Sequence, residues 1–315
     1  MKKRICYLIT FLTFIGINHK LNAQNQNITI SYQQNADKSV EFSYKKELPG
    51  SYYVKLEFQN LKNSVNTEYL GVIKNNSGKL IKLRPIDKNK HINFSYKYYT
   101  IRGNPNPKID KSFNYLLPFK AGKSIRILES TSLKEHYFNA EEDPNWKSYI
   151  VDRKSADTIY SMRKGIVIEL VNKFETDPLD AYIYTSSMNK IVIEHEDGTI
   201  SNYTGFDKKS IFVNLGQTVY PQTKLGVLNL FNNSVYRLYF DISFLKEADL
   251  GSAKKNSLSC KSNMEHITPY FYSVNGPFII KKDNEYVVEN DETIRLTEFT
   301  KSEKKKYDKN PQIFN

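Results

Sequence analysis

Apolar and polar residues alternate with a period of two along much of the chain, and this pattern limits the possible folds more than any other feature. In the segment "SVYRLYFDISF" (residues 234–244), apolar side chains share one face while Arg237 and Tyr239 share the other, as in a half-buried strand. Similar runs recur between residues 27 and 102, separated by Pro, Gly and Asn residues typical of turns. Because that region has no apolar residues at helical spacing, the sequence predicts an all-β protein.

Residues 1–23 have the order of a secretory signal peptide. The basic start "MKKR" precedes a 13-residue apolar run and then the stretch "NHKLNA", which ends at Ala23. Thirteen residues are too few to span a bilayer, and no later segment approaches the roughly 20 apolar residues that a spanning helix needs. We therefore expect cleavage after Ala23 and an exported mature chain, periplasmic or secreted, without a transmembrane segment.

Charge and cysteine content narrow the classes of partner and of fold. Removal of residues 1–23 takes away four basic residues, which lowers the formal charge from +12 to +8. A moderately basic exported chain suits anionic surfaces such as cell-wall polymers, although a solvated basic surface without a partner is equally ordinary. Nucleic acid is not an expected partner of an exported chain. Cys260 is the one cysteine left after processing, so an intrachain disulfide is excluded.

The distribution of strand-like runs and breakers predicts three parts in the mature chain. Residues 24–110 are expected to form a β-sandwich-like domain that ends near the breaker "GNPNPK" (103–108). Residues 111–245 contain a second series of strands, with glycines at strand edges or turns. Residues 246–315 are expected to form a short C-terminal β extension and a Lys- and Glu-rich tail, with residues 301–315 as a solvated end.

The second region resembles a known family. Four pieces occur in order, "DTIYSMRKGIVIEL", "NKIVIEHEDGTISNYTGF", "IFVNLGQTVYPQTKLGVL" and "YRLYFDI". Together they resemble the core of the LytM or lysostaphin-like peptidoglycan endopeptidases (peptidase family M twenty-three) over residues 115–244. The resemblance implies a duplicated hybrid motif β domain, and active members of the family cut peptide cross-links of bacterial cell walls with a zinc-bound water.

The residues that carry zinc chemistry in that family are mostly replaced here. The family pattern H-L-H-F-E-I falls on "RLYFDI", so its two histidines become Arg237 and Tyr239. The acidic ligand matches Asp152, while the histidine four residues earlier falls on Ser148 and a further site histidine falls on Gly205. Arginine stays protonated and offers donors only. The resemblance therefore implies a vestigial site at Asp152, Gly205, Arg237 and Tyr239, with no catalytic residue intact.

Two histidines remain as alternative metal ligands within the matched region. His136 lies in a polar stretch before Asp152, and His195 follows a strand-like run in "IEHEDG". Catalytic zinc needs three protein ligands and an open position. We interpret both histidines as ordinary, one solvated and one hydrogen-bonded at a strand end, and expect no metal or other cofactor. Zinc held by Asp152, His136 and His195 is the alternative.

Two function classes follow from this interpretation. In the first, the chain is a catalytically inactive relative of the zinc endopeptidases that binds cell-wall peptide or regulates a cell-wall hydrolase. In the second, it is an active zinc metalloendopeptidase with unorthodox ligands. The first interpretation predicts that the Arg237 guanidinium fills the place of the metal, hydrogen-bonds to the Asp152 carboxylate and has Tyr239 beside it. The alternative at this position is an Arg237 side chain turned toward solvent.

Overall fold

The computed structural model describes residues 28–105, 107–130, 147–175, 187–231, 235–249, 261–281 and 283–315. Its described residues are mostly in strands, with two α-helices and one 3-10 helix near the C-terminal end, so the predicted all-β class is confirmed. Within the described residues, no helix combines the length and apolar character needed to span a membrane. The expected signal peptide lies outside them.

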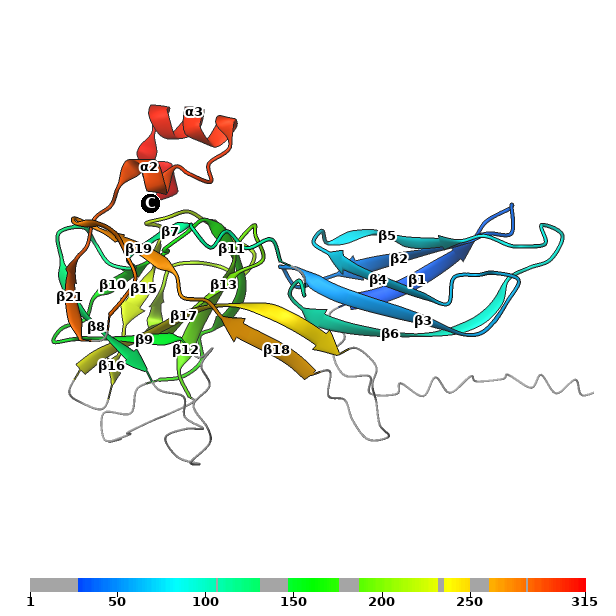
Figure 1. The fold of residues 1–315 in the computed structure, drawn as a ribbon, viewed down its shortest axis with the longest axis horizontal. Helices are drawn as coiled ribbons and strands as arrows, with labels where there is room; N and C mark the ends of the chain where they lie inside the picture. Colours follow the sequence, from blue (N-terminus) through cyan, green and yellow to red (C-terminus); the bar gives the residue numbers. More distant parts are fainter. Residues whose placement is uncertain are drawn as a thin grey trace, which may run out of the picture.

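The N-terminal part is a sandwich of two three-stranded antiparallel sheets, drawn in blue and cyan in Figure 1. Alternation along each strand sends one set of side chains inward, and Phe42, Val54, Leu56 and Leu83 are fully buried between the sheets. The strands of one sheet are β1 (Ile28–Gln34), β2 (Val40–Lys46) and β5 (Ser77–Leu83), and those of the other are β4 (Glu68–Ile73), β3 (Tyr52–Lys62) and β6 (Asn93–Arg102).

The central part is built on a large antiparallel sheet in the order β14-β11-β12-β13-β17-β9-β8-β21. One face of this sheet covers a core that includes Tyr149, Tyr203, Leu238 and Phe240. The strands on this path are β8 (Ser124–Ser130), β9 (Ser148–Arg153), β11 (Gly165–Val171), β12 (Asn189–Glu194), β13 (Ile200–Ile211), β14 (Thr218–Val219), β17 (Val235–Asp249) and β21 (Asn284–Val287). Four smaller strands pair with this sheet or with one another beside it: β10 (Thr158–Tyr160), β15 (Lys224–Leu228), β16 (Leu230–Phe231) and β18 (Lys261–His266). A separate three-stranded sheet, in which one pair is parallel, consists of β7 (Asn114–Leu116), β19 (Tyr270–Ser273) and β20 (Gly276–Phe278).

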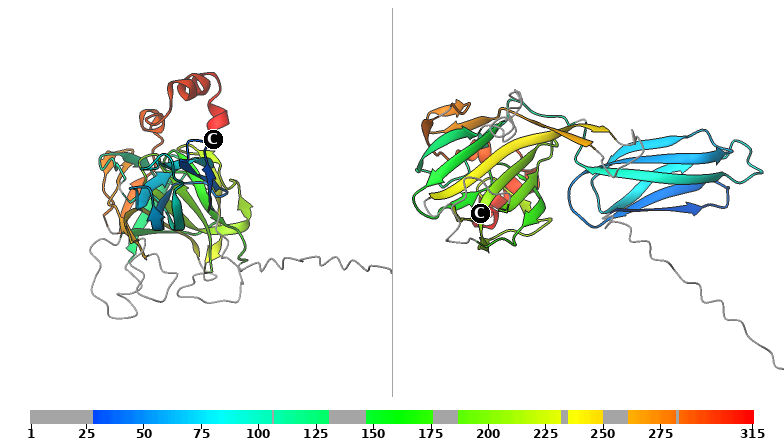
Figure 2. Two further views of the ribbon diagram at one scale, coloured as in Figure 1. Left: turned by 90° about the vertical axis from the view of Figure 1, so that its right-hand side faces the viewer. Right: turned by 90° about the horizontal axis from the view of Figure 1, so that it is seen from below.

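A two-stranded arm connects the central part with the sandwich. Strand β17 continues past residue 245, where the second region was expected to end, and pairs with β18. Figures 1 and 2 show this arm, in yellow and orange, reaching toward the sandwich. The two parts also meet directly, since the backbone N–H of Ser51 donates to the side-chain Oε2 of Glu194 at 2.7 Å. The central sheet, the arm and the sandwich therefore lie close together at this end of the central part.

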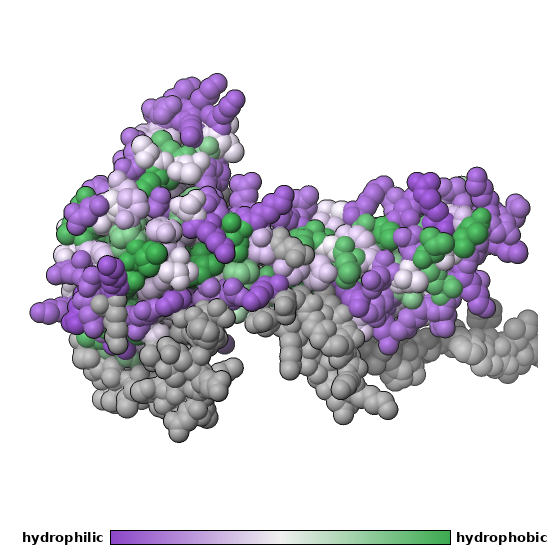
Figure 3. All heavy atoms as spheres, viewed as in Figure 1, coloured by the Kyte–Doolittle hydropathy of each residue, from purple (hydrophilic) through white to green (hydrophobic). Residues whose placement is uncertain are grey.

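The expectation of a solvated C-terminal end is wrong. Residues 291–315 form α2 (Glu292–Arg295), α3 (Lys301–Lys309) and the 3-10 helix η1 (Pro311–Phe314), and a Thr300–Glu303 capping box begins α3. Tyr307 and Phe314 are only 7% and 5% exposed, because they pack with Phe299 against the central part. Figure 3 shows hydrophilic residues over the outer side of this segment and more apolar residues beneath it. A few aromatic anchors thus bind an otherwise charged segment.

Candidate functional site

The register of three neighbouring strands brings the predicted site residues together. On β17, Arg237 lies directly opposite Asp152 of β9, and Tyr239 lies opposite Thr204 of β13. Cross-strand partners have Cβ atoms about 4.5–5.5 Å apart, which is within reach of a guanidinium and a carboxylate. Because side chains alternate, Arg237 and Tyr239 lie on the face opposite the buried core residue Leu238.

Arg237 and Asp152 form a bidentate ion pair, as the sequence predicted. Arg237 Nε donates to Asp152 Oδ1 at 2.6 Å and Nη2 donates to Oδ2 at 2.7 Å. The remaining nitrogen, Nη1, donates to the Tyr239 hydroxyl at 3.3 Å, and the guanidinium lies 4.6 Å from the ring centre of Phe231. These hydrogen bonds, first of all those to Asp152, raise the pKa of Arg237 above its ordinary value despite partial burial.

The side chains of this constellation do not fit a catalytic zinc ion. Zinc needs donors with free lone pairs, whereas Arg237 offers N–H groups only and engages both oxygens of Asp152. Tyr239 accepts from the same guanidinium. Among the described residues, no three His, Cys, Asp or Glu side chains lie together as a metal site. His136 lies outside the described residues.

His195 has the structural role that the sequence favoured. Its Nδ1 is 2.7 Å from the Lys164 carbonyl oxygen and its Nε2 is 2.6 Å from Ser201 Oγ, so both ring nitrogens are engaged. Ser201 lies opposite the buried Ile242, which places this histidine on the core side of the sheet, away from Arg237. Burial, helped by the positive charge of Arg163, lowers the pKa of His195 to about 3. The imidazole is therefore neutral at ordinary pH.

Gly205 marks a close approach between backbones. Its φ of +119° is rarely adopted by other residues, and a Cβ here would lie 2.1 Å from the carbonyl oxygen of Arg237. A histidine at this position would therefore clash with β17. The backbone of this chain thus excludes a side chain at the position where the family resemblance would put one.

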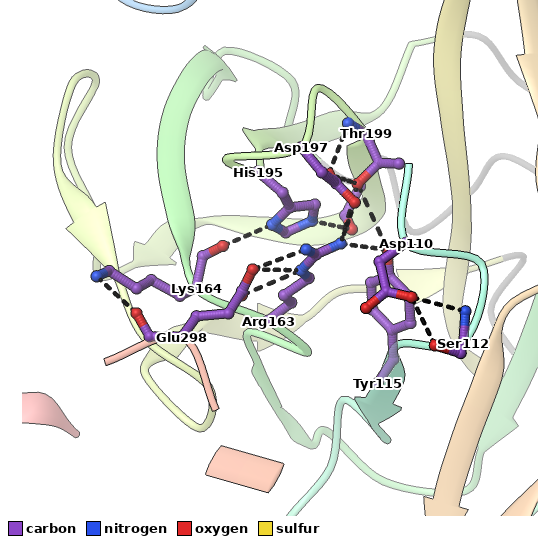
Figure 4. Close-up of polar contacts among 10 residues, drawn as sticks. Asp110, Ser112, Tyr115, Arg163, Lys164, His195, Asp197, Thr199 and Glu298 are labelled. Carbon is purple, nitrogen blue, oxygen red and sulfur yellow. Dashed lines mark hydrogen bonds and ion pairs between the residues drawn. The ribbon is translucent and has the colours of Figure 1, made fainter. Parts of the chain in front are cut away.

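A second arginine forms a larger polar network that sequence reasoning missed (Figure 4). Arg163 is 2% exposed, and its Nη2 donates to Glu298 at 2.7 Å while its Nη1 donates to Asp197 at 2.9 Å. Nη1 also donates to the Tyr115 hydroxyl at 2.9 Å, and the ring of Phe113 lies beneath the guanidinium. This network attaches the C-terminal segment to the core. No local motif marks Arg163, because its partner Glu298 lies 135 residues away in sequence.

Comparisons with known proteins find low likenesses among solved structures. No model of a known protein family matches the chain, and no curated protein matches it. Among solved structures, the chain is similar to a peptidase M23 structure from Pseudomonas aeruginosa, at 10% identity and a TM-score of 0.27 over 69% of this chain and 88% of that one. It is similar to a zinc-containing peptidase from Vibrio cholerae, at 15% identity and a TM-score of 0.25 over 72% and 80%. Csd3 of Helicobacter pylori gives 9% identity and a TM-score of 0.29 over 91% and 78%. Likenesses this low assign no activity.

Proposed function

We propose that this chain is an exported, catalytically inactive relative of the zinc peptidoglycan endopeptidases, which binds cell-wall peptide without cutting it. The observation that carries the proposal is the Arg237–Asp152 pair, with distances of 2.6 and 2.7 Å. A tethered cation stands where the family would hold a metal cation. The net charge of +8 on the mature chain suits an anionic polymer as partner.

The Arg237–Asp152 pair opposes both requirements of a zinc-peptidase mechanism, namely metal binding and a general base. Arg237 engages both oxygens of Asp152, so a metal ion could reach this carboxylate only by displacing a cation that would still lie beside it and repel it. A general base must accept a proton, and the guanidinium of Arg237, which stays protonated and offers donors only, cannot do so. The face can still bind, because the Arg237 and Asp152 side chains are 22% and 29% exposed.

Three measurements on the mature chain test this proposal together. Elemental analysis should find no stoichiometric zinc, and digestion of cross-linked wall peptide should be absent. The chain should sediment with isolated cell wall, and part of that binding should survive about 1 M salt, where charge attraction is screened.

Each outcome has a distinct meaning. One zinc per chain that is lost when His136 or His195 is replaced would overturn the proposal and favour an active metalloendopeptidase. Complete release at high salt would mean that wall binding is only nonspecific charge attraction. Absence of sedimentation would overturn wall binding and favour regulation of a cell-wall hydrolase, measurable as a changed rate of wall digestion by that enzyme.

A further inference from the structure

A hollow of about 360 Å³ lies on the same face of the central sheet, beyond Tyr239 along β17. The end of β6, the central sheet and the arm strand β18 all contribute walls, so three parts of the chain shape it. Ile168, Val192 and Ile200 supply an apolar cluster, and polar side chains converge from the sides. Small-ligand sites have volumes of roughly 300 Å³ upward, and this hollow has that size with a lining that is polar and apolar in similar measure.

A desolvated carboxylate lies on the β17 side of this hollow. Asp241 Oδ1 accepts a hydrogen bond from Asn202 Nδ2 at 2.8 Å, and His266 Nε2 lies 3.7 Å from the same oxygen. The Asp241 side chain is still 20% exposed, so a ligand can reach it. Burial raises the pKa of Asp241 to about 6, against the lowering effects of Asn202, Ser243 and Lys190. An added cation would favour the ionised carboxylate here.

Two cations share a single carboxylate on the opposite side of the hollow. Arg102 Nη1 lies 2.9 Å from Glu169 Oε2, and Lys190 Nζ lies 2.7 Å from Glu169 Oε1. This trio therefore carries a net charge of +1. The Arg102 and Lys190 side chains are 28% and 38% exposed. Both can donate to an additional carboxylate while keeping Glu169 as a partner.

The separation of the two charged sides matches a short peptide. Strand β13 lies between the strand of Lys190 and the strand of Asp241, and Lys190 is level with Tyr239, two residues along β17 from Asp241. Two strand spacings of roughly 4.8 Å and this offset of roughly 7 Å set the two Cα atoms about 12 Å apart. Both side chains line the hollow, and because an extended dipeptide spans at most about 7 Å, the side chains have to cover the rest of the distance. We propose that this pocket binds a short zwitterionic peptide, with its ammonium group on Asp241 and its carboxylate on Lys190 and Arg102. This inference goes beyond the proposed function, since it concerns free peptide and needs no binding of intact wall.

The test measures binding of the dipeptide alanyl-alanine and of its N-acetyl derivative to the mature chain by NMR titration. Wild type should prefer the free dipeptide, because acetylation removes the ammonium group. Asp241→Asn keeps the shape of the side chain. It should weaken binding of the free dipeptide by about tenfold or more, because a hydrogen bond to a charged group is lost. The same variant should no longer distinguish the two ligands, because both changes remove one interaction.

A second variant addresses the carboxylate end and covers the case in which Asp241→Asn fails to fold. Lys190→Gln should weaken binding of the free dipeptide. It should leave binding of the dipeptide's C-terminal amide, which lacks the carboxylate, unchanged. The matched control is Lys208→Gln, in a surface pair with Glu175 outside the pocket, which should bind like wild type. Absence of dipeptide binding at millimolar concentration, or equal binding of the N-acetyl and free forms by wild type, would overturn the proposal. Wall sedimentation is measured separately, so either proposal can fail without the other.

Discussion

Two arginines in the central part have similar carboxylate partners but very different surroundings. Arg163 is almost fully buried and bridges Glu298 and Asp197, which lie in segments far apart in sequence. Arg237 binds one carboxylate on the neighbouring strand and remains partly exposed. A guanidinium that connects distant segments under cover is part of the scaffold. One that occupies an open face can be changed at little cost to the fold, and so is available for function.

The largest effect should come from breaking the buried network. Arg163→Met would leave Asp197 and Glu298 without their cation, and removal of one partner of a buried pair costs about 3–5 kcal/mol. Denaturant unfolding of the mature chain measures this change. The control is Arg126→Met, which loses an exposed pair with Asp283 and should change the free energy of unfolding by less than about 0.5 kcal/mol. Similar losses in both variants would contradict the scaffold role.

The second-largest effect on stability should come from removing an aromatic anchor of the C-terminal segment. Phe299 is buried and its ring centre lies 4.9 Å from that of Tyr220 and 5.0 Å from that of Phe314. Phe299→Ala should therefore lower the free energy of unfolding by about 3 kcal/mol, as for other buried phenylalanines. Ile313→Ala in the same segment is the matched control, because Ile313 is mostly exposed and should have almost no effect. Equal, small losses would mean that the segment does not pack in solution.

Sequence patterns predicted local geometry well and long-range contacts poorly. Alternation placed Arg237 and Tyr239 on one face, and the family resemblance supplied Asp152 as the partner; the observed contact agrees. No pattern connected Arg163 with Glu298, since a pairing between segments 135 residues apart leaves no periodic trace. The segment "KSEKKKYDK" consists mostly of charged residues, so its composition predicts a solvated end and gives no sign that Tyr307 is a buried anchor.

Acid should destabilise the core through His195, by an intermediate amount. Its pKa is about 3 in the folded chain, because of burial first, against about 6.5 when unfolded. Below pH 6.5 the unfolded chain therefore binds a proton that the folded chain does not, so the free energy of unfolding falls as pH falls. The contribution of His195 amounts to roughly 1.6 kcal/mol between pH 6.5 and 5. Asp241, whose pKa is raised to about 6 in the folded chain, takes up a proton on folding over the same interval and opposes this contribution. Unfolding curves of wild type and of His195→Gln across that interval isolate the histidine contribution, because the variant should lose less stability than wild type as the pH falls. An unchanged slope in that variant would assign the effect to other groups.

The smallest effect on stability should come from the pair on the open face, and this prediction tests the comparison most directly. Arg237→Met removes the hydrogen bonds to Asp152, but the carboxylate is 29% exposed and can bind water instead. Partly exposed pairs contribute about 0.2–1 kcal/mol, so the free energy of unfolding should fall by about 1 kcal/mol or less. The bidentate geometry and the ring of Phe231 place the expected value toward the upper end of that range. Denaturant unfolding beside Arg163→Met gives the contrast in one experiment. A loss above about 3 kcal/mol would mean that Arg237 anchors the fold as Arg163 does, and the open face would then be scaffold rather than a surface free to evolve a new ligand.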